Sequence, residues 1–136
     1  MRVLTAESEA LIRMDLREML EDEGHDVVAE ACSGTEAVVL ARSCQPDVCF
    51  VGINMPAVSG IEATAAISAE AIAPVVILTA FARATLVDEA TRAGAIGYLA
   101  KPFSRDDLVA AMELAAAFAQ RRQDAPTIPP GKGSVD

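Results

Sequence analysis

The stretch that decides the fold reads Asp47-Val48-Cys49-Phe50-Val51-Gly52-Ile53-Asn54-Met55-Pro56. A short apolar run that is stopped by glycine and proline is typical of a buried strand. Comparable runs occupy residues 3–6, 27–31, 75–78 and 96–99, and a longer segment of helical character follows each run. Five strand-then-helix units predict an α/β fold, in which helices cover both faces of one parallel sheet.

Serine residues mark three of the helix starts. Ser33, Ser59 and Ser104 each precede an acidic residue by three positions, which is the spacing of a capping box. The first helix is expected to begin near Ser8 and to end before Gly24, because glycine favours the left-handed turn that closes a helix.

The limits of the remaining helices follow from periodicity. The fourth helix is expected over residues 84–93 and the last over about residues 105–122. No periodic pattern continues beyond that point, so we divide the chain into a domain at residues 1–122 and a flexible tail at residues 123–136.

The composition is that of one soluble globular domain. Of the 136 residues, 52% are hydrophobic and 23% are charged, which suffices for a single core. The net charge of -9 disfavours nucleic-acid binding. No apolar stretch approaches the length of a membrane span and no signal-peptide pattern opens the chain, so we expect a cytoplasmic protein without membrane association.

The cysteines and the single histidine suggest no site of their own. Cys32, Cys44 and Cys49 are odd in number and lack C-x-x-C spacing, so we expect neither disulfides nor zinc, but small core residues in a reducing cytosol. His25 follows Gly24 in a turn, and we expect it to face solvent.

Polar residues gather at the expected carboxyl ends of the strands, the edge where parallel sheets place their sites. They include Glu7, Ser8, Glu9, Thr79 and Lys101. Together with other landmarks they follow the order of a known family: Asn54-Met55-Pro56, Gly60, Leu78-Thr79-Ala80, Gly94-Ala95, Tyr98 and Lys101-Pro102-Phe103. Over about residues 1–122 the chain resembles the receiver domain of bacterial response regulators, in the CheY-like superfamily.

The resemblance implies a doubly wound, flavodoxin-like fold whose five-stranded parallel sheet has the strand order 2-1-3-4-5. It also implies a metal site. In the family, acidic residues at the positions of Glu7 and Ser8, the acceptor aspartate at the position of Gly52 and the carbonyl of Asn54 hold magnesium.

The resemblance further implies how the remaining landmarks act. The aspartate takes a phosphoryl group from a histidine kinase, and the lysine at Lys101 neutralises the transferring oxygens. Thr79 would bond the phosphoryl group, and Tyr98 would change rotamer in response. The peptide bond before Pro102 is expected to be cis.

This sequence departs from the family at two of these positions. Ser8 replaces a metal-binding carboxylate, and Gly52 removes both a second carboxylate and the nucleophile. We therefore predict an atypical receiver that binds no magnesium under physiological conditions and is not phosphorylated at residue 52. The landmarks around Gly52 favour a substituted acceptor over an ordinary strand-end glycine, while Ser8 can also serve as the N-cap of the first helix.

The pocket residues other than Ser8 and Gly52 each allow more than one interpretation. Lys101 has lost its usual aspartate, so it either pairs with Glu7 or leaves a basic spot in the vacated pocket. Glu7 and Glu9 can also be solvated acids of the first helical turn. Thr79 can be a simple β-branched strand residue, and Tyr98 more often packs as a partly buried aromatic than acts as a switch.

The last helix is apolar on more than one side. Glu113 is the only charged residue between positions 108 and 119, so Val109, Leu114 or Ala117 must fall outside the core-facing stripe. Such a helix predicts a partner surface, although an alanine-rich helix with a harmless exposed face has the same pattern. The family commonly uses this helix to dimerise or to engage partners.

We therefore expect a stand-alone receiver-like domain of a two-component pathway that acts through protein contacts and is not an enzyme. Its partner would be a histidine kinase, another regulator, or a second copy bound through the last helix. The alternative is a sensor of a small anion or metabolite that uses Ser8, Thr79 and Lys101. A third hypothesis keeps phosphotransfer with Ser59 or Glu7 as the acceptor, although neither is expected to occupy the place of the missing carboxylate.

Overall fold

The computed structural model describes residues 1–124 of the chain. The strands are β1 (Arg2–Ala6), β2 (Asp26–Ala31), β3 (Val48–Gly52), β4 (Val75–Thr79) and β5 (Gly97–Ala100). The helices are α1 (Ala10–Asp22), α2 (Gly34–Cys44), α3 (Gly60–Ala69), α4 (Ala84–Ala93) and α5 (Arg105–Asp124). The last helix continues to Asp124, two residues beyond its expected end, and the predicted tail from residue 125 onward lies outside the described residues.

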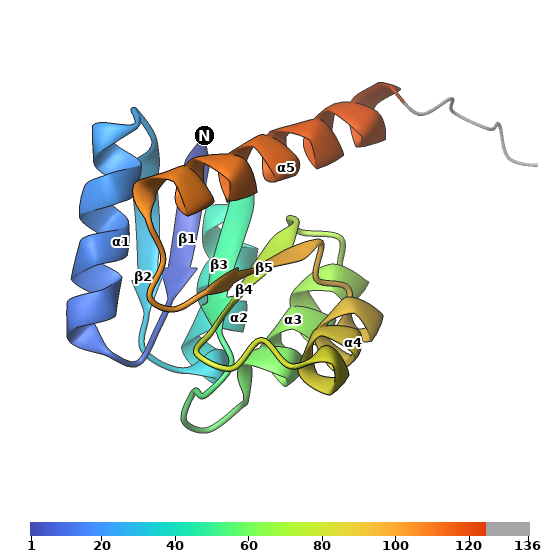
Figure 1. Cartoon of the computed structure of the whole chain (residues 1–136). Helices are drawn as coiled ribbons and strands as arrows, with labels where there is room; N and C mark the ends of the chain where they lie inside the picture. The colour runs from blue at the N-terminus through green and yellow to red at the C-terminus, as the bar shows by residue number, and fades with distance from the viewer. Residues whose placement is uncertain (125–136) are drawn as a thin grey trace, which may run out of the picture.

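The five strands form one parallel sheet in the order β2-β1-β3-β4-β5, which confirms the predicted α/β architecture. The chain thus moves outward from β1 to β2, then crosses back to β3 and continues to β5. Figure 1 shows the helices on both faces of this sheet, with α5 passing over it and extending beyond it at the carboxyl end of the helix. Both β2 and β5 are edge strands.

Each face of the sheet has its own apolar layer, because successive side chains of a strand point to opposite faces. On one face, Val3, Val48, Phe50, Val76 and Leu78 belong to a buried cluster with Leu16 and Leu20 of α1 and Leu108 and Met112 of α5. On the other face, Leu4, Cys49, Val51 and Ile77 belong to a cluster with residues of α2, α3 and α4. These two layers fix the carboxyl ends of the strands at one common edge.

Gly60 allows the start of α3 to lie against the end of β3. A Cβ atom at residue 60 would come within 2.0 Å of the carbonyl oxygen of Gly52, a backbone atom that cannot turn aside. The Gly60 N–H also donates to the carbonyl of Ile53 at 2.9 Å. This close approach holds the loop of residues 53–59 over the edge where the site residues meet.

The three predicted capping serines all act as caps. Ser59 forms the full box with Glu62, in which the serine hydroxyl and the glutamate carboxylate each accept a backbone N–H at 3.2 Å. Ser104 and Asp107 form the same reciprocal pair. Ser33 caps α2, while the Glu36 carboxylate accepts from the Cys32 N–H, one residue earlier than the box requires.

Replacing Ser59 by alanine is expected to destabilise the fold by about 1 kcal/mol, because the N–H of Glu62 loses its acceptor. Urea unfolding at neutral pH measures the change. Ser43→Ala is the matched control, since Ser43 lies inside α2, is exposed, and contacts only the nearby carbonyl of Leu40 and sulfur of Cys44. Equal midpoints for the two variants would contradict a capping contribution.

Candidate functional site

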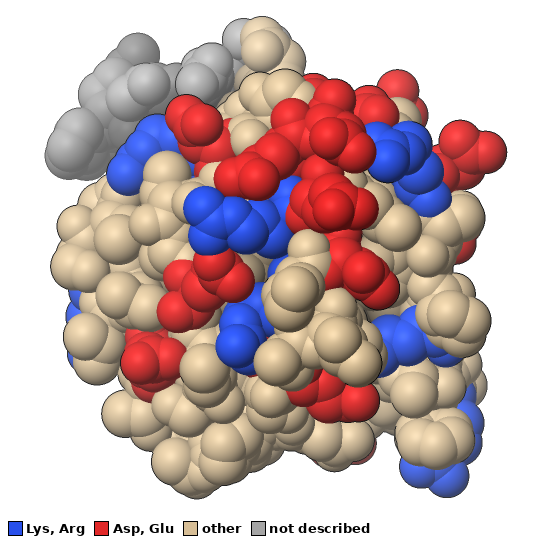
Figure 2. Space-filling view, turned by 90° about the vertical axis from the view of Figure 1, so that its left-hand side faces the viewer, with Lys and Arg blue, Asp and Glu red and all other residues tan. Residues whose placement is uncertain are grey.

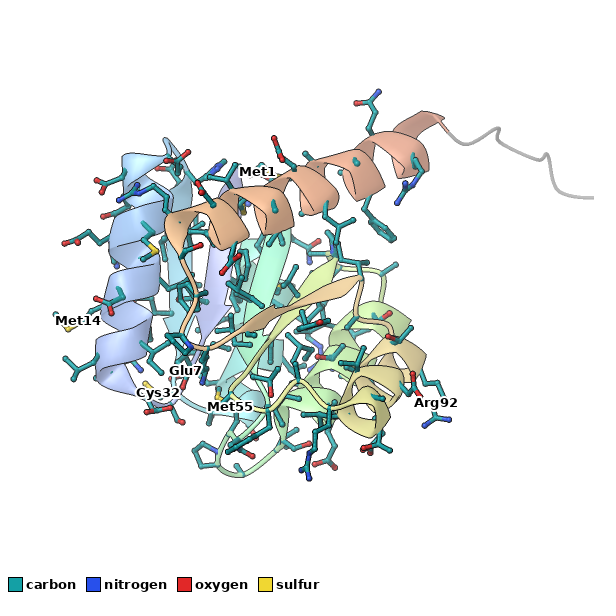
Figure 3. All side chains as sticks on the ribbon, viewed as in Figure 1. Met1, Glu7, Met14, Cys32, Met55 and Arg92 are labelled. Carbon is teal, nitrogen blue, oxygen red and sulfur yellow. The ribbon has the colours of Figure 1, made fainter. Side chains whose placement is uncertain are left out.

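The predicted pocket residues converge at the carboxyl edge of the sheet. Glu7 follows β1, Gly52 ends β3, Thr79 ends β4 and Lys101 follows β5. Figure 3 shows Glu7 at this edge, with Met55 on the neighbouring loop that follows β3. The order of the strands therefore brings together residues that lie up to 94 positions apart in the sequence, the separation of Glu7 from Lys101.

Glu7 and Lys101 form a largely buried ion pair. The Lys101 Nζ lies 2.6 Å from Glu7 Oε1. The side chain of Lys101 is 15% exposed and that of Glu7 is 2% exposed. Lys101 Nζ also lies 3.7 Å from a carboxylate oxygen of Glu9, which is well exposed. The sequence left open whether Lys101 pairs with Glu7 or leaves a basic spot in the pocket. In the structure it pairs with Glu7.

The backbone around Glu7 fixes the direction of its carboxylate. Oε2 accepts from the N–H of Glu9 at 3.0 Å, while Oε1 has no hydrogen-bond donor within residues 1–124 apart from its ion pair with Lys101. Arg13 of α1 donates from Nη1 to the carbonyl of Glu7 at 2.6 Å and lies 3.5 Å from Glu30. Removing Lys101 would therefore leave a buried carboxylate oxygen without a partner.

The carboxylate of Glu7 lies directly over Gly52. A Cβ atom at residue 52 would be 2.8 Å from Glu7 Oε1 and 3.4 Å from the carbonyl oxygen of Ala6. We expected that Glu7 would not occupy the place of the missing carboxylate; its Oε1 lies beside the point where a side chain at residue 52 would begin. The long side chain of Glu7 reaches across from β1 into the space next to Gly52, where Lys101 neutralises it.

Ser8 links two loops of the site and does not cap α1. Its hydroxyl donates to the carbonyl of Asn54 at 3.2 Å, which joins the loop after β1 to the loop after β3. The N-cap of α1 is Glu9, and that side chain makes no capping hydrogen bond. The interpretation of Ser8 as an N-cap is wrong, because the helix begins two residues later, at Ala10.

Thr79 is buried and bonded locally. Its hydroxyl accepts from the N–H of Phe81 at 3.0 Å, and its carbonyl accepts from the N–H of Lys101 at 2.7 Å. The peptide bond between Lys101 and Pro102 is cis, as expected. Thr79 thus positions the loop after β4 and the residue that carries the ammonium group, while its own hydroxyl is directed to the backbone.

A family model for the response regulator receiver domain matches residues 3–113. The chain belongs to the response regulator receiver family. It is a CheY-like domain of two-component signalling, and receiver domains of this kind contact kinases or other regulators.

Two named relatives place the chain within this family. It is 53% identical over 116 residues to the transcriptional regulatory protein PdtaR of Mycobacterium tuberculosis, covering 85% of this chain but 57% of PdtaR. It is 33% identical over 112 residues to the chemotaxis protein CheY of Thermotoga maritima, covering 82% of this chain and 93% of CheY. The chain therefore spans little more than half the length of PdtaR.

Solved receiver structures have the same fold. The signal receiver domain of a modulated diguanylate cyclase from Desulfovibrio desulfuricans G20 superposes with a TM-score of 0.82 at 32% identity, covering 89% of this chain and 97% of that one. The receiver domain of the regulator NarL from Mycobacterium tuberculosis gives 0.80 at 29% identity, with coverages of 85% and 95%. The flavodoxin-like fold is thereby confirmed.

The predicted interface residues of this receiver domain lie on an apolar groove or beside it. Leu114 of α5 is 39% exposed and Tyr98 of β5 is 49% exposed, so Tyr98 is a partly buried aromatic with much of its ring open to solvent. Both line a groove of about 350 Å³ between β5 and α5, with Asp107 and Ala110 also in its wall. Val109 is half-buried and faces a second, smaller hollow beside Met1 and His25.

The exposed side of α5 is as apolar as the sequence predicted. Leu114 and Ala117 are exposed, while Leu108, Met112 and Ala115 are buried. Leu114 also explains a glycine of β5, because a Cβ atom at Gly97 would be 2.8 Å from its Cδ2. The side chain of Leu114 therefore lies across the edge strand and closes one end of the contact between β5 and α5.

Three predictions for single side chains need correction. We expected all three cysteines to be core residues. Cys32 is exposed and Cys44 is half-buried, so only Cys49 lies in the core. Burial raises the pKa of the Cys49 thiol to about 12. His25 is half-buried and its Nδ1 lies 3.1 Å from the Met1 amino group, and burial and that positive charge lower the pKa of His25.

Sequence reasoning missed Arg13 as part of the site. An arginine on an amphipathic helix is ordinary, and its contact with the Glu7 carbonyl depends on how α1 packs beside β1. Within residues 1–124 no group of three or more His, Cys, Asp or Glu side chains is arranged to hold a metal ion. No helix in the described part of the chain is long and apolar enough to cross a membrane.

Proposed function

We propose that this chain is an atypical receiver domain that works without phosphorylation at residue 52 and acts through protein contacts in the cytoplasm. The observation that carries the proposal is the Glu7–Lys101 ion pair beside Gly52. Glycine offers no nucleophile, and the nearest carboxylate and the ammonium group already neutralise each other. The pocket therefore has an internal ion pair in the place where the family performs phosphoryl transfer.

The remaining oxygen atoms do not suit magnesium. Magnesium prefers octahedral oxygen ligands and is usually held by one or two carboxylates. Here Glu7 is bound to Lys101, Ser8 offers a hydroxyl that donates to the Asn54 carbonyl, and Gly52 offers no side chain. Two of the expected metal ligands thus bond to each other, so we propose no resident magnesium and no catalytic role for this domain.

The two rival hypotheses fit this geometry less well. Lys101 lies within 3.7 Å of two carboxylates, so it is not a free cation that could hold a small anion. Ser59, the other acceptor considered, uses its hydroxyl to cap α3. The name of PdtaR, a transcriptional regulatory protein, supports a regulatory role in preference to a catalytic one.

Acidic side chains disfavour nucleic acid as the partner. Figure 2 shows that Asp and Glu residues crowd the upper part of the face that carries α1, with Lys or Arg side chains between them. Asp22 and Glu23, at the end of α1, pair with Arg105 of α5. A phosphate backbone would be repelled there, so we propose a protein partner.

The native chain is expected to remain unmodified when it is incubated with acetyl phosphate and magnesium, because residue 52 lacks a nucleophile. Intact-mass spectrometry measures the result, and a CheY protein with its aspartate serves as the positive control. A mass increase of one phosphate group on this chain, or magnesium binding at sub-millimolar affinity in a titration, would overturn the proposal.

Replacing Leu114 by glutamate is expected to weaken association about tenfold or more, because a charge then enters an apolar contact surface. Pull-down from native lysate and light scattering measure partner binding and self-association. Leu11→Glu is the matched control, since Leu11 is 76% exposed on α1, away from the groove. Association that both variants retain, with melting curves unchanged, would count against this surface.

A further inference from the structure

The groove between β5 and α5 has an open side. β5 is an edge strand that pairs only with β4 in the described chain, and its residues Tyr98, Leu99 and Ala100 line the groove. Tyr98 and Leu114 provide apolar walls, and small residues such as Ala110 and Ala111 let a ligand approach the helix backbone. Asp107, at the far end near the start of α5, is the charged residue of the lining. The groove thus has a mainly apolar lining and one negatively charged residue.

The sequence that follows α5 has the chemistry that such a groove would bind. It reads Pro126-Thr127-Ile128-Pro129-Pro130-Gly131-Lys132. Segments with Pro-x-x-Pro spacing bind grooves lined by aromatic side chains, because proline restricts the chain in advance and presents an apolar ridge. Lys132 places a positive charge three residues after Pro129. This segment therefore combines an apolar ridge with a cation, the complement of the groove.

The lengths of the two partners match. Along α5, Leu114 lies about 15 Å and Asp107 about 26 Å before Asp124, at about 1.5 Å per helical residue. A proline-rich strand advances about 3.1 Å per residue, so Pro129 can reach about 15 Å and Lys132 about 25 Å beyond Asp124. A segment that turns back at Ala125 thus brings Pro129 opposite Leu114 and Lys132 opposite Asp107.

We propose that residues 126–132 of this chain bind intramolecularly in the groove lined by Tyr98, Leu114 and Asp107. The carboxylate of Asp107 can accept a further donor, because only Oδ2 is used by the Ser104 N–H and the side chain is exposed. Asp106, the preceding residue of the same helix, is exposed and adds negative charge near the start of α5, so a cation is favoured at this end. The segment would cover the surface that the proposed function assigns to partners, and a partner would have to displace it.

Tyrosine emission offers a direct test on the full chain. Tyr98 is the only tyrosine and the sequence has no tryptophan, so the emission reports on this groove alone. A tethered segment acts at an effective concentration on the order of 1 mM, so even a weak contact is occupied. Replacing Pro126, Ile128 and Pro129 together by glycine is expected to raise the acrylamide quenching of Tyr98 about twofold, because the groove then opens.

Charge variants show whether the segment binds through a specific contact between Lys132 and Asp107 or only shields the groove non-specifically. Lys132→Glu and Asp107→Asn are each expected to weaken docking about twofold to fivefold, and their effects should not add, since they remove the same contact. Asp107→Asn keeps an oxygen for the Ser104 N–H, so the cap of α5 survives. Val135→Gly, beyond the segment, is the control and should leave quenching unchanged.

Two outcomes would overturn the inference. Equal quenching of Tyr98 in the native chain and the triple glycine variant would show that the segment does not cover the groove. Protection that disappears on dilution would show exchange between copies and would exclude intramolecular docking. Neither outcome concerns phosphorylation or partner binding. The docking inference can therefore fail while the proposed function stands, and the proposed function can fail while the segment still docks.

Discussion

Replacing Lys101 by methionine is expected to destabilise the domain by about 3–5 kcal/mol, the range for removing one member of a buried ion pair. The Glu7 side chain is 2% exposed, and Oε1 has no other hydrogen-bond donor in the described chain. Its charge would then lie buried without a counter-ion. Chemical unfolding at pH 7, followed by circular dichroism, measures the loss.

Two further variants show whether the ion pair is the cause. The double variant Glu7→Leu with Lys101→Met is expected to be more stable than Lys101→Met alone, because no charge remains buried. Arg105→Met is the matched control, since it removes a cation that pairs with Asp22 and Glu23 on the open surface. A loss at Lys101 no larger than that at Arg105 would refute the buried-pair interpretation.

Introducing carboxylates at residues 8 and 52 is expected to confer magnesium binding and phosphorylation. The double variant Ser8→Asp with Gly52→Asp should bind magnesium with a dissociation constant on the order of 1 mM, because the site regains two anionic oxygen ligands. It should also gain the mass of one phosphate group on incubation with acetyl phosphate, since the aspartate introduced at position 52 supplies the nucleophile. Calorimetry and intact-mass spectrometry measure these two gains.

Because Glu7 lies beside residue 52, the control for the aspartate variant must have a side chain of the same size at that position. A side chain at residue 52 would meet Glu7 Oε1 at 2.8 Å, so the flexible carboxylate of Glu7 must move and Lys101 must then serve two anions. Ser8→Asp with Gly52→Asn has nearly the same size without the nucleophile and should take up no phosphate. Phosphate on this asparagine control, or none on the aspartate variant despite bound magnesium, would refute the role assigned to residue 52.

Much of the fold could be predicted because its local signals agree with one another. Apolar runs placed all five strands, and the serine boxes at Ser59 and Ser104 placed helix starts that the structure confirms. The start of α1 was misplaced, because Ser8 has the chemistry of a cap but donates instead to Asn54 across the site. A local propensity was overridden there by a contact between residues 46 positions apart.

The sequence predicted which residues form the site, but not how their side chains are arranged. The order of the landmarks brought Glu7, Gly52, Thr79 and Lys101 to one edge, and the structure places them there. That Glu7 extends over Gly52 depends on side-chain length and on the direction fixed by the Glu9 N–H and by Arg13. The exposure of Tyr98 likewise depends on how α5 lies relative to β5, which no local pattern encodes.

The Glu7–Lys101 contact has a consequence for how such a domain can be controlled. Both groups belong to one molecule, so the contact forms without any second component. A ligand shifts a conformational equilibrium only by its differential affinity for the two states, so a ligand of this pocket has to compete with the ion pair. Under the proposed function no phosphoryl group adjusts this pocket, so the number of copies of the protein in the cell would set how much partner is bound.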